Sequence, residues 1–192
     1  MPVPEAIHTA RLFLRPWRAD DAGPLLPVLE ANQAHLGSWI PRRVSEPVPV
    51  PQLAVRLAGF AADFAAGREW RYGMFTPDGA VVIGEVSLFP RDANGRVPFP
   101  GADRAEIGYC LRSDRTGRGL ATEATRAMID VAATLPGIGH IEIRCDARNA
   151  ASAAIPQRLG FELAMMSEEP AHAPGAADSM LQVWTLALAQ RA

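Results

Sequence analysis

The chain has 192 residues, of which 48% are hydrophobic and 21% charged, and its formal net charge is −2. This composition excludes a mainly disordered chain, and the near-neutral charge gives no general reason to expect nucleic-acid or membrane binding. No apolar run approaches the ~18 residues of a membrane span and the first residues lack a signal-peptide pattern, so we expect one cytoplasmic domain over residues 1–192.

The first half of the chain is predicted to form a strand, two helices and a hairpin. Residues 7–17 contain an apolar stretch ended by Pro16, which predicts a strand. Residues 22–34 and 53–66 have the spacing of helices, and Gly67 ends the second one. The proline-rich segment 37–51 between them is predicted to be a loop. Strands 70–76 and 81–89 are joined by a Pro-Asp-Gly turn, whose proline and glycine suit a hairpin.

The second half is predicted to alternate strands and helices. We expect a loop over residues 90–103, strands at 105–111 and 138–146, helices at 120–133 and 149–159, and final strands at 161–166 and 180–188. The resulting order, β-α-α-β-β-β-α-β-α-β-β, predicts an α/β sheet with mixed strand directions. Cys110 and Cys145 fall inside predicted strands, so we expect buried free thiols. No cluster has metal-ligand spacing, and we expect no metal site.

A glycine turn stands between the strand at 105–111 and the helix at 120–133. Gly117 and Gly119 let the backbone approach a ligand closely, and the first amides of the helix have no intrahelical partner. A strand, a glycine turn and a helix N-terminus together predict a site for a phosphate group. The turn is neither G-x-x-x-x-G-K-[ST] nor G-x-G-x-x-G, which argues against an NTPase or a dehydrogenase.

Five segments together resemble the GNAT superfamily of acetyl-CoA-dependent N-acetyltransferases, in particular the branch related to RimJ and RimL. They are Arg11–Arg15, Ile83–Leu88, Ala105–Leu111, Gly117–Ala124 and Asn149–Phe161, and their order spans a core of about residues 9–188. The resemblance implies an α/β GNAT fold, in which helices flank a mixed, mostly antiparallel central sheet with splayed central strands. It also implies direct transfer of an acetyl group from acetyl-CoA, as cosubstrate, to a primary amine.

The resemblance assigns a set of cofactor-binding residues. The loop that would hold the pyrophosphate comprises Gly117, Arg118, Gly119, Leu120, Ala121 and Thr122. Thr116 precedes it where the superfamily usually has glutamine or arginine. Cys110, Leu111 and Arg112 would pair with the pantetheine amides, and Asn149 would contact the cofactor near them. Arg158 would either reach a cofactor phosphate or remain an exposed helix arginine.

The resemblance also addresses the proton donor for the leaving thiolate. Many superfamily members have a tyrosine seven residues after the asparagine, where this chain has Pro156. In the RimJ/RimL-like branch a serine three residues after the asparagine is the implied substitute, and here it is Ser152. The alternative for Ser152 is a structural hydroxyl that caps the helix or bonds its backbone.

Glu106 is the leading candidate for the base, because the family places a carboxylate on this strand. A carboxylate in a half-buried cleft can relay a proton through water; the alternative is a solvent-facing glutamate or an ion pair with an arginine such as Arg104. A second carboxylate found in some relatives aligns near Ala171, with Glu168 and Glu169 as imperfect substitutes. These two glutamates are expected to form a solvated loop face, or to attract a cationic amine.

The acceptor has no readable motif. It is a protein N-terminal α-amine or a small-molecule amine, and the loop at 37–51, which carries Trp39, lies where this branch forms the acceptor wall. A long acidic groove would favour a peptide or a polyamine, and a closed aromatic pocket a small molecule. The missing tyrosine leaves open a CoA-binding regulatory or interaction module with little or no turnover. The oligomeric state, monomer or homodimer, also stays open.

Overall fold

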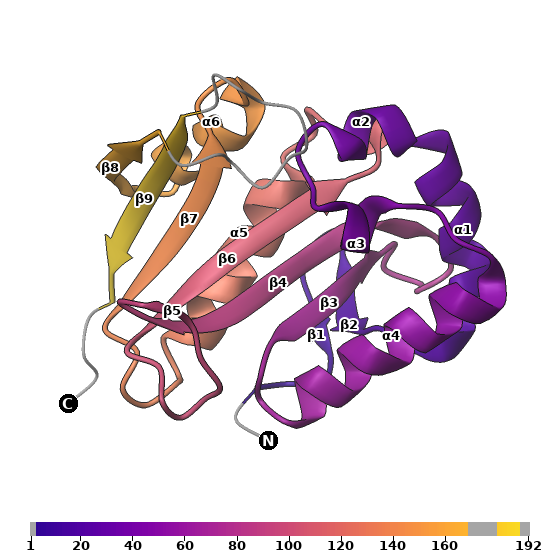
Figure 1. Cartoon of the computed structure of the whole chain (residues 1–192), viewed down its shortest axis with the longest axis horizontal. Helices are drawn as coiled ribbons and strands as arrows, with labels where there is room; N and C mark the ends of the chain where they lie inside the picture. Colours follow the sequence, from indigo (N-terminus) through magenta and orange to yellow (C-terminus); the bar gives the residue numbers. More distant parts are fainter. Residues whose placement is uncertain (1–2, 169–179, 189–192) are drawn as a thin grey trace.

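The fold is built on one sheet whose strand order differs from the chain order. The computed structural model describes residues 3–168 and 180–188. Within these ranges nine strands form the order β1-β2-β3-β4-β6-β7-β9-β8, and β5 pairs with β4 (Figure 1). The strands are β1 (Ile7–His8), β2 (Phe13–Pro16), β3 (Trp70–Phe75), β4 (Val82–Asp92), β5 (Gly95–Arg96), β6 (Arg104–Leu111), β7 (His140–Asp146), β8 (Glu162–Ser167) and β9 (Leu181–Ala187).

The two central strands β6 and β7 diverge along their length. They form the one parallel pair among the pairings of the described strands; the others are antiparallel. The parallel ladder ends at Ile107 and Ile143, although β6 continues to Leu111 and β7 to Asp146. The predicted mixed, mostly antiparallel sheet with splayed central strands is therefore confirmed.

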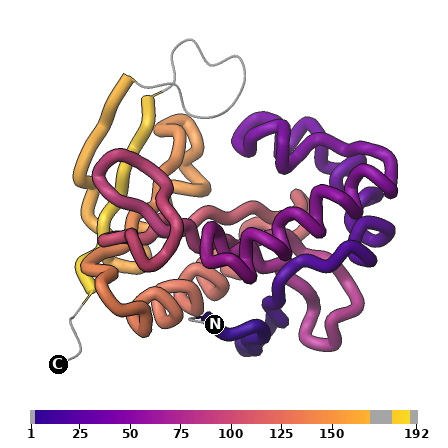
Figure 2. The backbone as a smooth tube through the Cα atoms, turned by 60° about the horizontal axis from the view of Figure 1, so that its bottom comes forward, coloured from indigo at the N-terminus to yellow at the C-terminus, as the bar shows by residue number. Residues whose placement is uncertain are grey.

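Helices cover both faces of the sheet. They are α1 (Ala22–Ala31), α2 (Gln33–Gly37), α3 (Arg42–Ser45), α4 (Val50–Ala65), α5 (Leu120–Ala132) and α6 (Ala150–Arg158). In Figure 1, α5 lies behind the sheet and α4 in front of it. Figure 2 shows β7, α6, β8 and β9 at one end of the molecule and α1 to α4 at the other. No helix in the described ranges has the length and apolarity needed to cross a bilayer.

Two hydrophobic clusters hold these layers together. One joins α5 and α6 to the sheet and includes Ala124 and Met128, both fully buried. The other joins α1, α2 and α4 to the opposite face through residues such as Leu53, Leu57 and Phe60. The three- and four-residue spacing of these last positions places them on one side of α4, as the sequence pattern predicts.

Several local elements differ from the predicted ones because a contact overrides the local pattern. The strand predicted at 7–17 is two short strands, since the Thr9 side chain accepts from Leu12 N and turns the chain. The helix predicted at 22–34 breaks at Asn32, whose side chain bonds Val28 O and Ser113. The segment at 37–51 contains α3, and the loop at 90–103 contains β5.

Candidate functional site

The glycine turn leads directly into α5. Gly117 and Gly119 have φ values of +70° and +75°, a region natural only for glycine. Gly119 is the N-cap, and the first helical hydrogen bond runs from Glu123 N to Gly119 O at 3.0 Å. The amides of residues 120–122 therefore have no intrahelical partner, and α5 presents the predicted anion site at its N-terminus.

Arg115, two residues before the turn, is a cationic side chain that can donate a hydrogen bond to a ligand. Its Nε is buried and has no hydrogen-bond partner within the described ranges, and its ion pair with Asp114 is long, with 3.9 Å between Nε and Oδ2. A guanidinium N–H of this kind suits a phosphate oxygen. Arg118, inside the turn, is exposed. The turn, the helix end and these arginines fit a diphosphate group.

A clamp formed by Arg11 and Glu123 holds the turn in shape. The Glu123 carboxylate accepts from Thr9 Oγ1 at 2.6 Å, Arg11 N at 2.8 Å and Arg11 Nε at 2.7 Å. Arg11 NH1 donates to the carbonyl of Arg118 at 2.8 Å. Burial raises the pKa of Glu123, but the hydrogen bonds from Thr9 and Arg11 outweigh it, so this pKa lies below its ordinary value. The turn is thus tied to the beginning of the chain.

The end of β6 presents backbone amides to the gap between β6 and β7. The Arg112 amide points toward β4, where it donates to Ile83 O at 3.0 Å. Because successive amides along a strand alternate in direction, the N–H groups of Leu111 and Tyr109 point toward the other edge, where β7 has diverged. These amides can pair with an extended ligand or donate to an oxyanion.

The N-terminus of α6 lies across the same gap. Asn149 is the N-cap, and its side-chain oxygen accepts from Ser152 N at 3.0 Å. Ser152 Oγ donates to Tyr109 Oη at 3.2 Å. The cap is therefore Asn149, not Ser152, and the Ser152 hydroxyl meets the Tyr109 side chain of β6.

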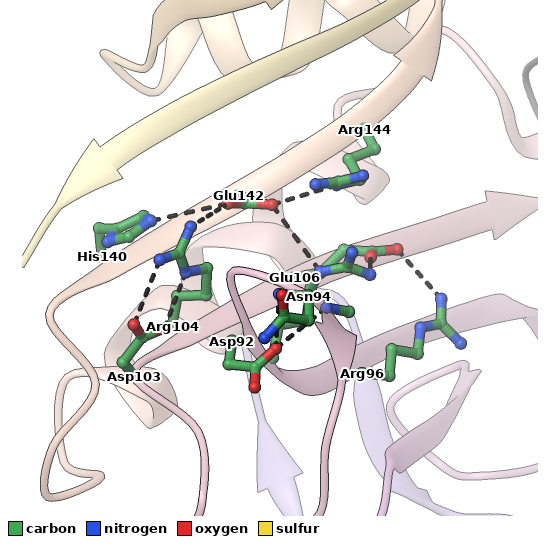
Figure 3. Close-up of polar contacts among 11 residues, drawn as sticks. Asp92, Asn94, Arg96, Asp103, Arg104, Glu106, His140, Glu142 and Arg144 are labelled. Atoms are coloured by element: carbon green, nitrogen blue, oxygen red, sulfur yellow. Dashed lines mark hydrogen bonds and ion pairs between the residues drawn. The ribbon is translucent and has the colours of Figure 1, made fainter. Parts of the chain in front are cut away.

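Glu106 lies on the opposite face of the sheet, in an ion-pair network shown in Figure 3. It is 7% exposed, and its two carboxylate oxygens accept from Arg91 NH1 at 2.7 Å and Arg96 NH2 at 3.1 Å. The expected alternative partner, Arg104, pairs instead with Asp103 at 2.8 Å and Glu142 at 3.4 Å. Glu106 would have to leave an arginine before it could accept a proton, so the geometry does not support the predicted base role.

A narrow cavity lies on this same face, under α1 and α4 and beside the end of β6. Its lining is mostly apolar and includes Trp17 and Cys110. The space that water centres can occupy is about 40 Å³, which holds only a few water molecules. Glu85, the one carboxylate in its described lining, accepts from Trp17 Nε1 at 2.8 Å, Arg71 NH1 at 2.7 Å and Ser87 Oγ at 3.0 Å. The cavity suits an apolar group.

The remaining residues predicted to belong to the site have no specific contact there in the described part of the chain. Arg158 is exposed in the last turn of α6. Trp39 is half-buried and does not line the cavity, although its neighbour Ile40 does. Glu168 is exposed just after β8. Glu169 and Ala171 lie outside the described residues.

Sequence reasoning missed the supporting residues of the site. Arg11, Tyr109 and Glu123 fall inside the family-like segments, so those segments could have drawn attention to them. Asn32 and Arg115 had no signal, because their roles depend on a contact with Ser113 and on an unpaired buried nitrogen. These properties exist only once the chain is folded.

Comparison with known proteins identifies the family and the fold. Residues 11–162 match the family model for the acetyltransferase (GNAT) domain. The chain is 26% identical over 150 residues to the probable N-acetyltransferase YjcK of Bacillus subtilis (strain 168), covering 78% of this chain and 80% of YjcK. RimL, a ribosomal-protein α-N-acetyltransferase in complex with coenzyme A, has a TM-score of 0.80 at 19% identity, with 98% and 99% of the two chains covered. The microcin self-immunity acetyltransferase MccE, in complex with acetyl-CoA and AMP, has a TM-score of 0.76 at 19% identity, with 96% and 97% covered.

These matches decide the class of protein. The structural likeness confirms the predicted fold, and the family match confirms the resemblance to acetyl-CoA-dependent N-acetyltransferases. The chain belongs to the acetyltransferase (GNAT) domain family.

Proposed function

We propose that this chain transfers the acetyl group of acetyl-CoA to the primary amine of a protein N-terminus or a small molecule, with Ser152 as the proton donor. The observation that supports this proposal most strongly is the hydrogen bond from the Ser152 hydroxyl to Tyr109, which lies in the part of β6 that no longer pairs with β7. We further propose that one domain over residues 1–192 carries the activity.

We assign the cofactor-binding residues to successive parts of acetyl-CoA along the gap between β6 and β7. The amides of Gly117 to Thr122, with the side chains of Arg115 and Arg118, would hold the pyrophosphate. Leu111 would bind the pantetheine arm through its backbone. Cys110 and Arg112 stay proposed pantetheine contacts through other atoms, because their amides face β4. The Oδ1 atom of Asn149 caps α6, so its Nδ2 is the group we assign to the cofactor. Arg158 stays a proposed phosphate contact.

The proposed catalytic roles follow from where negative charge develops during acetyl transfer, on the carbonyl oxygen and on the leaving sulfur. Acetyl-CoA supplies a thioester whose C–S bond breaks as the amine nitrogen bonds to the carbonyl carbon. The Leu111 amide would donate to the carbonyl oxygen, where negative charge develops. Ser152 would give its proton to the sulfur, whose thiol has an ordinary pKa of about 8.5. The amine must arrive neutral. Its proton passes to water and from there back to Ser152, which is protonated again at the end of the reaction. Glu106 is not assigned as the base, because both of its oxygens are held by arginines.

Transfer is proposed to be direct, without an acylated cysteine. Burial, and next the charge of Glu85, raise the pKa of the Cys110 thiol to about 12. Burial also raises the pKa of Cys145 above its ordinary value, although a hydrogen bond with Ser152 opposes the shift. Both thiols are therefore protonated near pH 7, and a thiol is a poor nucleophile compared with its thiolate.

The acceptor is proposed to approach from the face that carries the cavity. The mostly apolar lining favours an amine carried on a small apolar group, either on a small molecule or on the first residue of a peptide. Polyamines suit it poorly, because Glu85 already accepts three hydrogen bonds. The cytoplasm remains the proposed location, since Cys110 and Cys145 are free thiols; monomer and homodimer both remain open.

The test of the proposed function joins a binding and a turnover measurement. At about 100 times its Kd, acetyl-CoA should stabilise the fold by about 2.7 kcal/mol, which raises Tm by about 8 °C in a chain of this length. Acetylated pantetheine, which lacks the pyrophosphate, should give a much smaller shift. Thiol release is then measured with arylalkylamines, peptides and polyamines. An absent Tm shift contradicts the cofactor site, and a shift without thiol release from any amine supports the CoA-binding module instead.

Glu123→Gln is expected to raise the Kd for acetyl-CoA about fivefold, because Arg11 loses its anionic partner and no longer holds the turn. It should also lower Tm at pH 7. Since the folded pKa of Glu123 is depressed, its contribution is present above the ordinary value of 4.5 and is lost as pH falls through the folded pKa. The Tm difference from wild type should therefore shrink below about pH 4.5.

The matched control is Asp63→Asn, which breaks the exposed Asp63–Arg68 pair far from the turn in sequence. It should leave the Kd unchanged, since surface pairs contribute little. Equal Kd values for Glu123→Gln and wild type, measured by calorimetry, would rule out the clamp as a support of the cofactor loop.

A further inference from the structure

The hydroxyl groups of Tyr109 and Ser152 meet across the gap between β6 and β7. Tyr109 Oη donates to the carbonyl oxygen of Ser152 at 3.0 Å, and Ser152 Oγ donates to Tyr109 Oη at 3.2 Å. Tyr109 lies two residues beyond Ile107, where the β6–β7 ladder ends. The pair therefore ties the free end of β6 to the beginning of α6 at the level where the strands have separated.

Pro156 explains why a tyrosine can bind this carbonyl. In an α-helix, the carbonyl of residue 152 would accept from the N–H of residue 156. Pro156 lies inside α6 and has no N–H, so the Ser152 carbonyl lacks its helical donor. A buried carbonyl needs a partner, and the Tyr109 hydroxyl takes the place of the missing amide.

We propose that Tyr109 is a positioning residue that orients the Ser152 hydroxyl for acetyl transfer. This inference rests on the proposed function, in which Ser152 gives its proton to the leaving sulfur. The serine hydroxyl can rotate freely about Cα–Cβ, and its bond to Tyr109 Oη holds it in the gap. When Ser152 turns its proton to the sulfur, Tyr109 can redirect its own O–H to Ser152 Oγ, 3.2 Å away, and stabilise the charge developing there.

Tyr109 serves as an orienting group and not as the acid itself. Burial raises its pKa well above the ordinary value, and the hydrogen bond with Ser152 opposes this only in part. The phenol therefore stays protonated and keeps both a donor and an acceptor for Ser152. Ser152 is held at three atoms: its amide by Asn149, its carbonyl and its hydroxyl by Tyr109.

The test compares two variants, each of which removes the hydroxyl group of one buried tyrosine. Tyr109→Phe should lower kcat about tenfold in the thiol-release assay while leaving the Kd for acetyl-CoA within about twofold. Tyr72→Phe is the matched control, because Tyr72 is also buried and also donates to a backbone carbonyl, that of Pro4, at 2.8 Å. Tyr72→Phe should leave kcat unchanged. Equal kcat values for the two variants would overturn the proposal.

Combining Tyr109→Phe with each of two further substitutions separates a positioning role of Tyr109 from a role in stabilising the fold. If Tyr109 acts through Ser152, Tyr109→Phe should change kcat less than about twofold in Ser152→Ala, as expected for coupled residues. Pro156→Ala restores the amide that bonds the Ser152 carbonyl. In this background Tyr109→Phe should lower Tm less than it does in the wild-type chain, but it should still lower kcat. The proposal would be overturned if Tyr109→Phe lowered kcat by the full tenfold in Ser152→Ala, or if it did not lower kcat at all in Pro156→Ala. Failure of the proposed function differs, since wild type would then release no thiol.

Discussion

Replacing Ser152 with alanine is expected to lower kcat for acetyl transfer about 100-fold while leaving the Kd for acetyl-CoA within about twofold. The variant removes the proposed proton donor to the leaving sulfur. It keeps the amide of residue 152, which Asn149 holds, and the carbonyl, which Tyr109 holds, so α6 should stay in place. The measurement is thiol release at saturating acetyl-CoA and amine.

The control for this change is Thr134→Ala. Thr134 Oγ1 donates to the carbonyl of Val131 at 2.7 Å, just beyond the C-terminal end of α5 and therefore about 20 Å from the glycine turn. Its loss should leave kcat unchanged. If Ser152→Ala keeps kcat within twofold of wild type, water or another group protonates the sulfur, and the role assigned to Ser152 is wrong.

Gly84→Ala is expected to destabilise the fold by about 3 kcal/mol, a fall in Tm of about 10 °C. Gly84 in β4 pairs with Leu111 at the end of β6. A Cβ at this position would meet the carbonyl oxygen of Cys110 and lie 3.0 Å from Leu111 Cα. These are backbone atoms that cannot turn aside, so β6 must shift away from β4. The measurement is thermal and denaturant unfolding without ligand.

The matched control is Gly59→Ala, in the middle of α4. No atom lies within 4 Å of the position its Cβ would take, so alanine should stabilise the helix by up to about 1 kcal/mol. Because β6 carries the amides assigned to the cofactor, Gly84→Ala should also weaken acetyl-CoA binding, and Gly59→Ala should not. A Tm for Gly84→Ala within 2 °C of wild type, roughly the effect of 1 kcal/mol, would contradict the steric argument.

The elements that depend on neighbouring residues were predictable from the sequence. The Pro77-Asp78-Gly79 turn, Gly67 at the end of α4 and the glycine turn before α5 follow from dihedral preferences, and the positive φ of Gly67, Gly79 and Gly119 agrees with them. The break at Asn32 and the split of the first strand were not predictable in this way. The break at Asn32 depends on a contact with Ser113, which is distant in sequence. The split of the first strand depends on the Thr9 side chain, which bonds both Leu12 N and the distant Glu123.

The sequence by itself predicted most of the strands and helices and the glycine turn, because these depend on residue types at short, readable spacings. The resemblance of five segments indicated the family. The tertiary structure alone decided that Glu106 lies between Arg91 and Arg96 and that Tyr109 meets Ser152. The latter contact joins residues 43 positions apart, and the Arg11–Glu123 clamp joins residues 112 apart. Local propensities act over a few residues, whereas such contacts depend on which strands become neighbours and where β6 and β7 separate.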